Sequence, residues 1–273
     1  MSAPIGVFDS GYGGLTILKE LKKQLPQYDY IYLGDNARAP YGTRSFDTVY
    51  EYTLEAVKWF FEQGCSLVIL ACNTASAKAL RNIQQLDLPN LAPEKRVLGV
   101  IRPSSEVLGN YSKTGHVGLM ATPGTVQSDS YLIEMAKFFP EIKVHQQACP
   151  MWVPLIENGE YDQPGADYFV KLYLDQLFSQ SKDIDAILLA CTHYPLLEAK
   201  IKAYLPKEVQ LISQGQIVAK SLAQYLDNHS EIAQKCSQQG VLQFYTTDNP
   251  QTFEKQASSF FGQKIEAKHA DLT

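Results

Sequence analysis

Two cysteines occupy matching places in the chain, each directly after an apolar run that is typical of a buried strand. Cys72 follows residues 67–71, and Cys191 follows residues 186–190. The residues that come after them can all form hydrogen bonds: Asn73, Thr74, Thr192 and His193. A thiol just before a helix N-terminus lies in a positive potential that favours the thiolate. A single cysteine at the end of an apolar strand usually packs in the core as a small hydrophobic residue. Two cysteines in equivalent places indicate that they take part in a reaction or bind a ligand.

Two such thiols on opposite sides of a cleft are compatible with four kinds of site. With Asp9 and His193 they could bind zinc, although zinc ligands usually come in pairs from one short motif. One cysteine could be a nucleophile with His193 as base and Asp9 orienting the imidazole, which leaves the other cysteine without a role. A redox disulfide needs Cα atoms within about 7 Å and leaves no room for a substrate. Proton transfer at opposite faces of one carbon uses both thiols and inverts a stereocentre.

The elements that must position these residues alternate between strand-like and helix-like runs, as in an α/β protein with parallel sheets. The first predicted strand, residues 5–8, leads into a glycine-rich loop at 9–14, and the strand at 97–101 is expected to stop at Pro103. Ligands of parallel sheets bind beyond the carboxyl ends of the strands. The polar residues suited to chemistry gather at those ends: Asp9, Ser10, Asp35, Asn36, Cys72, Asn73, Thr74, Thr122, Cys191, Thr192 and His193.

The order of the predicted strands repeats within the chain. The offset is 112 residues from Ile5 to Val117, from Tyr30 to Ile142 and from Val97 to Val209. The repeat predicts two similar α/β domains with mainly parallel sheets, related by a pseudo-two-fold axis, with the active site in the cleft between them. We expect residues 1–100 and 214–273 to form the first domain and residues 101–213 the second, because the tail is too short to be a third.

The composition excludes several classes of function. The chain has 273 residues, 45% of them hydrophobic and 19% charged, which is ordinary for a globular protein with a sizeable core. A net charge of −5 provides no basic surface for nucleic acid, and no apolar run approaches the ~20 residues that cross a membrane. The N-terminus begins directly as a strand, so we expect a cytoplasmic protein. Five cysteines without Cys-x-x-Cys spacing predict reduced thiols, and Cys65, Cys149 and Cys236 are expected to be structural.

Several segments together resemble a known enzyme family. They are Asp9–Gly14, Gly34–Asn36, Pro40–Gly42, Ala71–Ala75 and Ala190–Leu197, with Pro154-Leu155-Ile156-Glu157 as a further match. They are similar to the glutamate racemases of the cofactor-independent aspartate/glutamate racemase superfamily, and the similarity extends from residue 5 to about 226. The two cysteine motifs point to the superfamily, and the glycine-rich opening with Pro-Tyr-Gly narrows the match to its glutamate members.

The resemblance implies roles for individual residues. Cys72 would take the α-proton of D-glutamate and Cys191 that of L-glutamate. Asp9 and His193 would support the two thiols, with Glu157 as a possible further helper. The residues that match positions holding the substrate amino and carboxylate groups are Asp9, Ser10, Tyr41, Gly42, Asn73, Thr74, Thr192 and His193, with Thr122 in a comparable loop.

The resemblance also implies no metal, no cofactor, a homodimer, and D-glutamate for peptidoglycan synthesis and hence for cell-wall biogenesis and cell shape. No Lys lies beside the cysteine motifs as a Schiff-base candidate. Ser213-Gln214-Gly215 departs from the family pattern, in which an acidic or small residue before the glycine is expected. Alternatives that stay open are another acidic amino acid as substrate, a hydrolase that uses one thiol, and a two-lobed amino-acid-binding protein.

Overall fold

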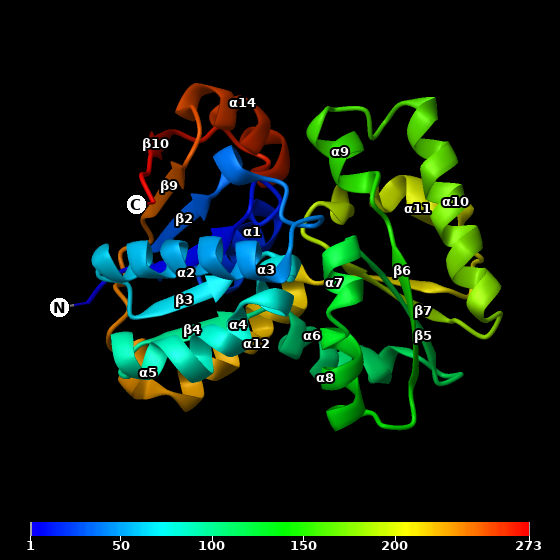
Figure 1. Ribbon diagram of the computed structural model, residues 1–273, viewed down its shortest axis with the longest axis horizontal. Helices are drawn as coiled ribbons and strands as arrows, with labels where there is room; N and C mark the ends of the chain where they lie inside the picture. Colours follow the sequence, from blue (N-terminus) through cyan, green and yellow to red (C-terminus); the bar gives the residue numbers. More distant parts are fainter. Residues whose placement is uncertain (1, 273) are drawn as a thin grey trace.

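The computed structural model describes residues 2–272, whose strands form two sheets with helices on both faces (Figure 1). The strand order is β10-β9-β2-β1-β3-β4 in the first sheet and β6-β5-β7-β8 in the second. All strand pairs within the two sheets are parallel. The strands are β1 (Ile5–Asp9), β2 (Tyr30–Gly34), β3 (Leu67–Leu70), β4 (Arg96–Gly99), β5 (His116–Ala121), β6 (Lys143–Ala148), β7 (Ala186–Ala190), β8 (Gln210–Ser213), β9 (Leu242–Thr246) and β10 (Ala267–His269).

The two sheets share one topology, because the order β2-β1-β3-β4 recurs as β6-β5-β7-β8. The register also corresponds: Gly6 lies opposite Val68 in the first sheet, and Gly118 lies opposite Ile187 in the second. The offset is 112 residues for the glycines and 119 residues for their partners. This confirms the prediction of two α/β domains with parallel sheets. Residues at equivalent positions of the two sheets are therefore brought to equivalent strand ends.

Helices cover both faces of the first sheet. The helices of this sheet that precede the second sheet in the chain are α1 (Leu15–Gln24), α2 (Phe46–Glu62), α3 (Asn73–Lys78), α4 (Leu80–Asn82) and α5 (Leu88–Leu91). Alternate residues of β1 reach opposite cores: Ile5 and Val7 pack in the core that contains α1, and Phe8 packs in the core that contains α2. Burial on both faces explains why these strands are continuous apolar runs in the sequence.

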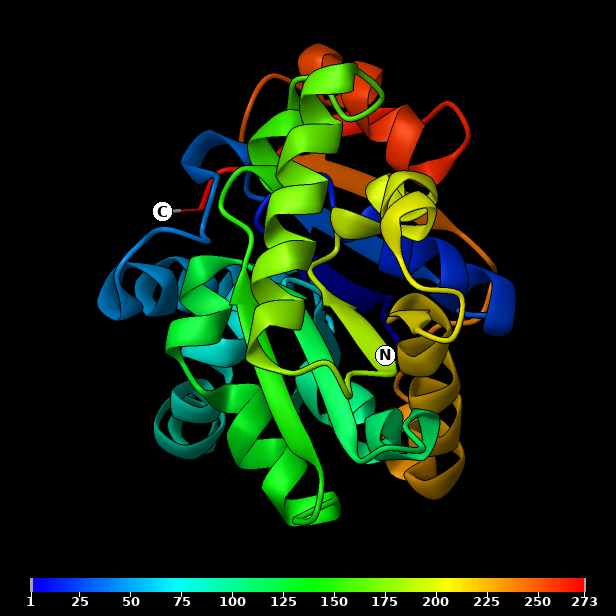
Figure 2. The ribbon, with the colours of Figure 1, turned by 90° about the vertical axis from the view of Figure 1, so that its right-hand side faces the viewer.

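The second sheet is covered in the same way. Its helices are α6 (Ile101–Leu108), α7 (Pro123–Gln127), α8 (Ser130–Phe138), α9 (Trp152–Glu157), α10 (Pro164–Gln180) and α11 (Glu198–Tyr204). Figure 2, which looks onto this domain, shows α10 across the front of the sheet. In β7, Ile187 packs in the core that contains α10, whereas Leu188 packs in the core that contains α6 and α8.

The tail returns to the first sheet. It comprises α12 (Gly215–Asn228), α13 (Ser230–Ala233), β9, α14 (Pro250–Phe261) and β10. β9 pairs with β2, and Figure 1 shows the red and orange end of the chain beside the blue β2. This pairing supports the division that we propose, with residues 214–273 joining residues 1–100 and residues 101–213 forming the second domain. Among residues 2–272, no helix has both the length and the apolar character needed to cross a bilayer.

One predicted boundary is wrong. The strand expected over residues 97–101 ends at Gly99, and Ile101 is already the first residue of α6. Pro103 lies in the first turn of that helix rather than stopping a strand. A proline is tolerated there, because the backbone N–H groups of the first turn have no partner within the helix.

Candidate active site

The strands of the first sheet point toward the second domain, so their carboxyl ends meet the strand ends of the second sheet (Figure 1). Two hydrogen bonds join the two sets of ends. The Thr192 hydroxyl donates to Asp9 Oδ1 at 3.2 Å, and the Thr16 hydroxyl donates to the Thr192 carbonyl at 2.9 Å. The end of β1 and the first turn of α1 are therefore in direct contact with the motif that follows β7.

Cys72 is the N-cap residue of α3, and its sulfur accepts the Ala75 N–H at 3.5 Å. Asn73 and Thr74, which follow it, already lie inside the helix. The Ser10 hydroxyl lies 3.5 Å from the same sulfur. The side chain of Cys72 is thus held between a helix N-terminus and the loop after β1.

The helix N-terminus does not make Cys72 a thiolate. Burial raises the pKa of Cys72 to about 12, and the negative charge of Asp9 contributes in the same direction. The hydrogen bonds from Ser10 and Ala75 oppose this rise without cancelling it. Desolvation of the charged form therefore outweighs the helix dipole, and Cys72 is a protonated thiol at neutral pH.

Cys191 has a different neighbour, the imidazole of His193. Its sulfur lies 4.0 Å from His193 Nδ1, and His193 Nε2 lies 2.9 Å from Glu157 Oε1. Burial alone would lower the pKa of His193, but the contacts with Cys191 and Glu157 outweigh burial and raise it to about 10. The imidazolium therefore places a positive charge between the Cys191 sulfur and the Glu157 carboxylate.

Asp9 is fully buried at the end of β1 and does not orient His193 as the single-nucleophile hypothesis requires. Its oxygens accept the Gly11 N–H at 3.0 Å and the Thr192 hydroxyl, while the hydrogen-bond partner of His193 is Glu157. Burial raises the pKa of Asp9 above its usual range, against the charge of His193 and backbone N–H groups. Asp9 therefore contacts the second domain through Thr192 instead of through the imidazole.

Both sulfur-bearing residues are almost enclosed. Cys72 is 6% exposed and Cys191 is 7% exposed, and Asn73, Thr74, Thr192 and His193 are buried with them. A dry enclosure strengthens every electrostatic interaction inside it.

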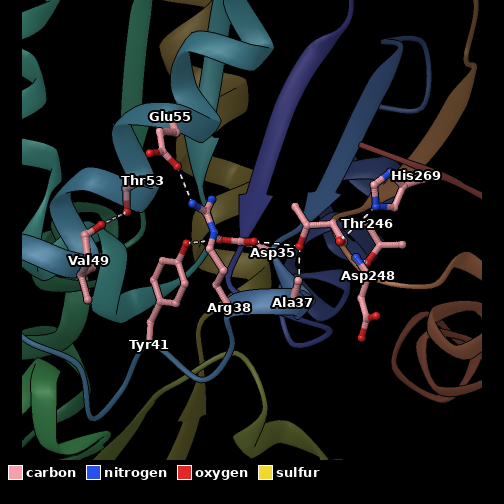
Figure 3. A network of polar contacts seen from close by, with 11 residues as sticks. Asp35, Ala37, Arg38, Tyr41, Val49, Thr53, Glu55, Thr246, Asp248 and His269 are labelled. Carbon is pink, nitrogen blue, oxygen red and sulfur yellow. Dashed lines mark hydrogen bonds and ion pairs between the residues drawn. The ribbon is translucent and has the colours of Figure 1, made fainter. Parts of the chain in front are cut away.

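The loop that carries Tyr41 and Gly42 is fixed by an ionic network around the buried carboxylate of Asp35 (Figure 3). Asp35, directly after β2, accepts Arg38 Nε at 2.8 Å and the Thr247 hydroxyl at 2.8 Å, and the Tyr41 hydroxyl donates to it as well. Arg38 also pairs with Glu55 of α2. The phenol of Tyr41 is therefore committed to Asp35, and only other atoms of Tyr41 remain for a substrate.

A set of hydroxyl and backbone contacts joins this side of the first domain to α7. The Thr74 and Thr122 hydroxyls lie 2.9 Å apart, and the Gly124 N–H donates to the Gly42 carbonyl at 2.8 Å. The predicted residues Gly42, Thr74 and Thr122 are thus neighbours. A Cβ added at Gly42 would lie 2.9 Å from Thr122 Cβ, so only glycine fits this close approach.

Asn73 is held by residues that sequence reasoning missed. Its Nδ2 donates to Gln214 Oε1 at 2.7 Å, and the Tyr131 hydroxyl donates to its Oδ1 at 2.7 Å. Nothing in the sequence pointed to Tyr131 as a site residue, because it lies within an ordinary amphipathic helix. Gln214 could have been noticed in the sequence, because it departs from the family pattern.

The residues that the sequence analysis considered as zinc ligands do not form a metal site in the structure. Among the described residues, no group of three His, Cys, Asp or Glu side chains is arranged to hold a metal ion. Cys65, Cys72, Cys149, Cys191 and Cys236 are all buried free thiols, so the redox disulfide is not formed either. A cavity of about 860 Å³ lies between α3, α6, α8 and α12, and none of the predicted site residues lines it.

Comparison with known proteins identifies the family. The Asp/Glu/hydantoin racemase family model matches residues 5–222. A glutamate racemase from Ruegeria sp. is 41% identical over 271 residues, which cover 96% of this chain and 97% of the relative.

Solved structures agree with this match. The glutamate racemase isoform of Bacillus anthracis superimposes with a TM-score of 0.89 at 35% identity and covers 99% of this chain and 98% of its own. The Francisella tularensis glutamate racemase in complex with D-glutamate has a TM-score of 0.88 at 33% identity, with the same coverage. The chain therefore belongs, with the glutamate racemases, to the Asp/Glu/hydantoin racemase family of amino-acid racemases.

Proposed function

We propose that this racemase interconverts L- and D-glutamate by proton transfer between two thiols, Cys72 and Cys191. The observation that carries the proposal is the duplicated strand end: each cysteine follows the strand at the same place in the order of its sheet. A reaction that removes a proton from one face of a carbon and delivers another to the opposite face needs two such groups. Neither a single-thiol hydrolase nor a binding protein needs the second one.

The charges around the two sulfurs differ. Cys72 is a thiol, because burial and Asp9 raise its pKa to about 12, while Cys191 lies beside the positively charged imidazole of His193. In this state Cys191 takes the α-proton of L-glutamate and Cys72 delivers its proton to the opposite face, which gives D-glutamate. The products of that step are a Cys191 thiol and a Cys72 thiolate, which is the state that accepts D-glutamate.

The α-proton of an amino acid is a very weak acid. The surrounding residues therefore have to lower the free-energy barrier to its removal without a cofactor. Donors at the strand ends, among them the Ser10 and Thr74 hydroxyls and the backbone of Thr192, are suited to bind the α-carboxylate, on which negative charge would otherwise accumulate. Preorganised donors in an enclosed site stabilise a developing charge more than water does. The committed phenol of Tyr41 leaves backbone atoms of the 41–42 segment for a substrate carboxylate.

The choice of glutamate rests on the relatives, since those compared are glutamate racemases and the Francisella tularensis structure contains D-glutamate. We also propose that D-glutamate from this reaction is used for peptidoglycan synthesis, that the enzyme acts in the cytoplasm, and that it forms a homodimer. These proposals follow from the family resemblance.

The test is α-hydrogen exchange in D2O. Incubation with either enantiomer of glutamate should give the racemate with deuterium at the α-carbon, measured by proton NMR and by circular dichroism of the substrate. Aspartate and other acidic amino acids in the same assay establish the substrate range. Exchange with aspartate alone would replace glutamate as substrate, and no exchange with any acidic amino acid would reject the function.

A further inference from the structure

Gln214, the residue that departs from the family pattern, lies where the chain leaves the second sheet. It stands between β8 and α12, and it is 2% exposed. A buried amide has two donors and an acceptor that need partners, so its surroundings reveal what it holds.

All three requirements of the Gln214 amide are met by separate elements. Its Oε1 accepts Asn73 Nδ2 of α3 at 2.7 Å. Its Nε2 donates to the Tyr131 hydroxyl of α8 at 2.7 Å and to the Ser104 hydroxyl of α6 at 2.7 Å. Gln214 therefore connects one helix of the first domain with two helices that cover the second sheet.

The directions of these hydrogen bonds are mutually consistent. Ser104 donates its own hydrogen to the Val100 carbonyl at 2.8 Å, so its oxygen is free to accept from Gln214. Tyr131 donates to Asn73 Oδ1, so its oxygen is also free to accept. Asn73 is thereby fixed at both ends of its amide, while one N–H and one oxygen lone pair remain for another partner.

We propose that Gln214 is a positioning residue for catalysis: it fixes the Asn73 side chain and, through it, the first turn of α3, whose N-cap is Cys72. This inference rests on the proposed function and on the substrate-binding role of Asn73 that the family resemblance implies. A glutamine fits and a carboxylate does not, because Tyr131 and Ser104 both need a donor from residue 214. Gln214 itself touches neither sulfur and acts through Asn73.

The variant Gln214→Met tests the proposal, since it keeps an unbranched side chain but removes the donors and the acceptor. A loosened Asn73 weakens substrate binding, so we expect KM for both enantiomers to rise on the order of tenfold while kcat changes less than about threefold. A purely structural role would instead lower kcat per mole of protein and leave KM unchanged, and that result would overturn the proposal.

Two further variants make the test decisive. Tyr131→Phe removes the second hydrogen bond to Asn73, together with one acceptor of the Gln214 amide, and should also raise KM. It decides the matter if Gln214→Met does not fold. Ser104→Ala removes a bond at the far side of Gln214, whose Nε2 keeps the Val100 carbonyl within 3.4 Å, so KM should stay at the wild-type value. A KM that is unchanged in Tyr131→Phe, or equally raised in Ser104→Ala, contradicts the proposal.

The wild-type protein, assayed in parallel, separates this inference from the proposed function. Absence of glutamate racemisation by the wild type would reject the function itself. Normal wild-type racemisation with wild-type KM in folded Gln214→Met would reject only the role of Gln214. Non-additive effects in the double variant Gln214→Met/Tyr131→Phe would show that the two residues act on one target, as the shared partner Asn73 requires.

Discussion

At the scale of single residues, the two thiols differ although their positions in the sheets are equivalent. Cys72 has a carboxylate and a hydroxyl nearby, whereas Cys191 has an imidazole that is itself paired with Glu157. Cys72 is therefore kept protonated, whereas Cys191 lies beside a positive charge. A two-base racemase needs this asymmetry in each resting state, because one group must be a base while the other is an acid.

Replacement of either cysteine tests this division of labour. Cys72→Ala and Cys191→Ala should each lower the racemisation rate by at least about 10³-fold, the loss of a general acid or base. In D2O, Cys72→Ala should still exchange the α-hydrogen of L-glutamate slowly without racemising it, and Cys191→Ala should do so only with D-glutamate. A single variant that racemises at the wild-type rate would contradict the two-base mechanism.

The imidazolium of His193 predicts a pH dependence of stability. The pKa of His193 is about 10 in the folded protein and about 6.5 when unfolded, so the folded state binds more protons between these values. The stability from this group is fully present below pH 6.5 and is lost as the pH rises toward 10, by up to about 1.4 kcal/mol per pH unit.

Urea unfolding checks this prediction between about pH 6.5, where the unfolded imidazole loses its proton, and about pH 8.5, where the thiols of the unfolded chain begin to titrate. The free energy of unfolding should fall with pH in the wild type and should fall less steeply in His193→Asn. Identical slopes in the two proteins would show that the imidazole is not charged in the folded state.

At the scale of elements, the segment between β2 and α2 is held by the Asp35 network and carries Tyr41 and Gly42 to the strand ends. Tyr41→Phe should lower the free energy of unfolding by about 1–3 kcal/mol, because a buried carboxylate loses a donor. It should raise KM only a few-fold, since the phenol does not face the substrate.

A matched control exists for this substitution. Tyr50→Phe in α2 removes a phenol–carboxylate bond to Asp87, 2.7 Å long, outside the cluster of strand ends. It should leave KM unchanged. A loss of kcat near 100-fold in Tyr41→Phe, with stability preserved, would mean that the phenol acts on the substrate directly.

The elements also show how much of the structure can be predicted from the sequence. Continuous apolar strands, their repeat and the polar residues at their ends are local features, so they predict the parallel sheets and the residues near Cys72 and Cys191. Side-chain partners such as Tyr131, 58 positions from Asn73, depend on tertiary packing and leave no local trace. The sequence analysis did not predict β10, because this strand has only three residues, two of them exposed, and pairs only with β9.

At the scale of the whole molecule, the loop after β1 is pressed against the second domain at Gly13. A Cβ at this position would overlap the Thr192 hydroxyl and the His193 ring, whereas a Cβ at Gly11 would meet Glu157 Oε1 only at 3.5 Å, an ordinary contact. Gly13→Ala should therefore push the two domains apart at the site.

We expect kcat/KM of Gly13→Ala to fall on the order of 100-fold, the effect of a displacement near 1 Å at reacting groups. Gly11→Ala, the same substitution in the same loop, should stay within about threefold of the wild type, because its new methyl group meets an ordinary contact. Steady-state kinetics in both directions measures the difference, and equal effects of the two variants would refute the close approach as the cause.

The chain passes between the two domains twice, after β4 and after β8, and the passages lie together where Gln214 Nε2 is 3.4 Å from the Val100 carbonyl. Two adjacent covalent tethers make rotation about the line through them the motion that strains the fewest bonds. A rotation that opens the site has to break the contacts of Gly42 with Gly124 and of Thr74 with Thr122. If substrate enters and product leaves by such a rotation, its rate is an upper bound on turnover.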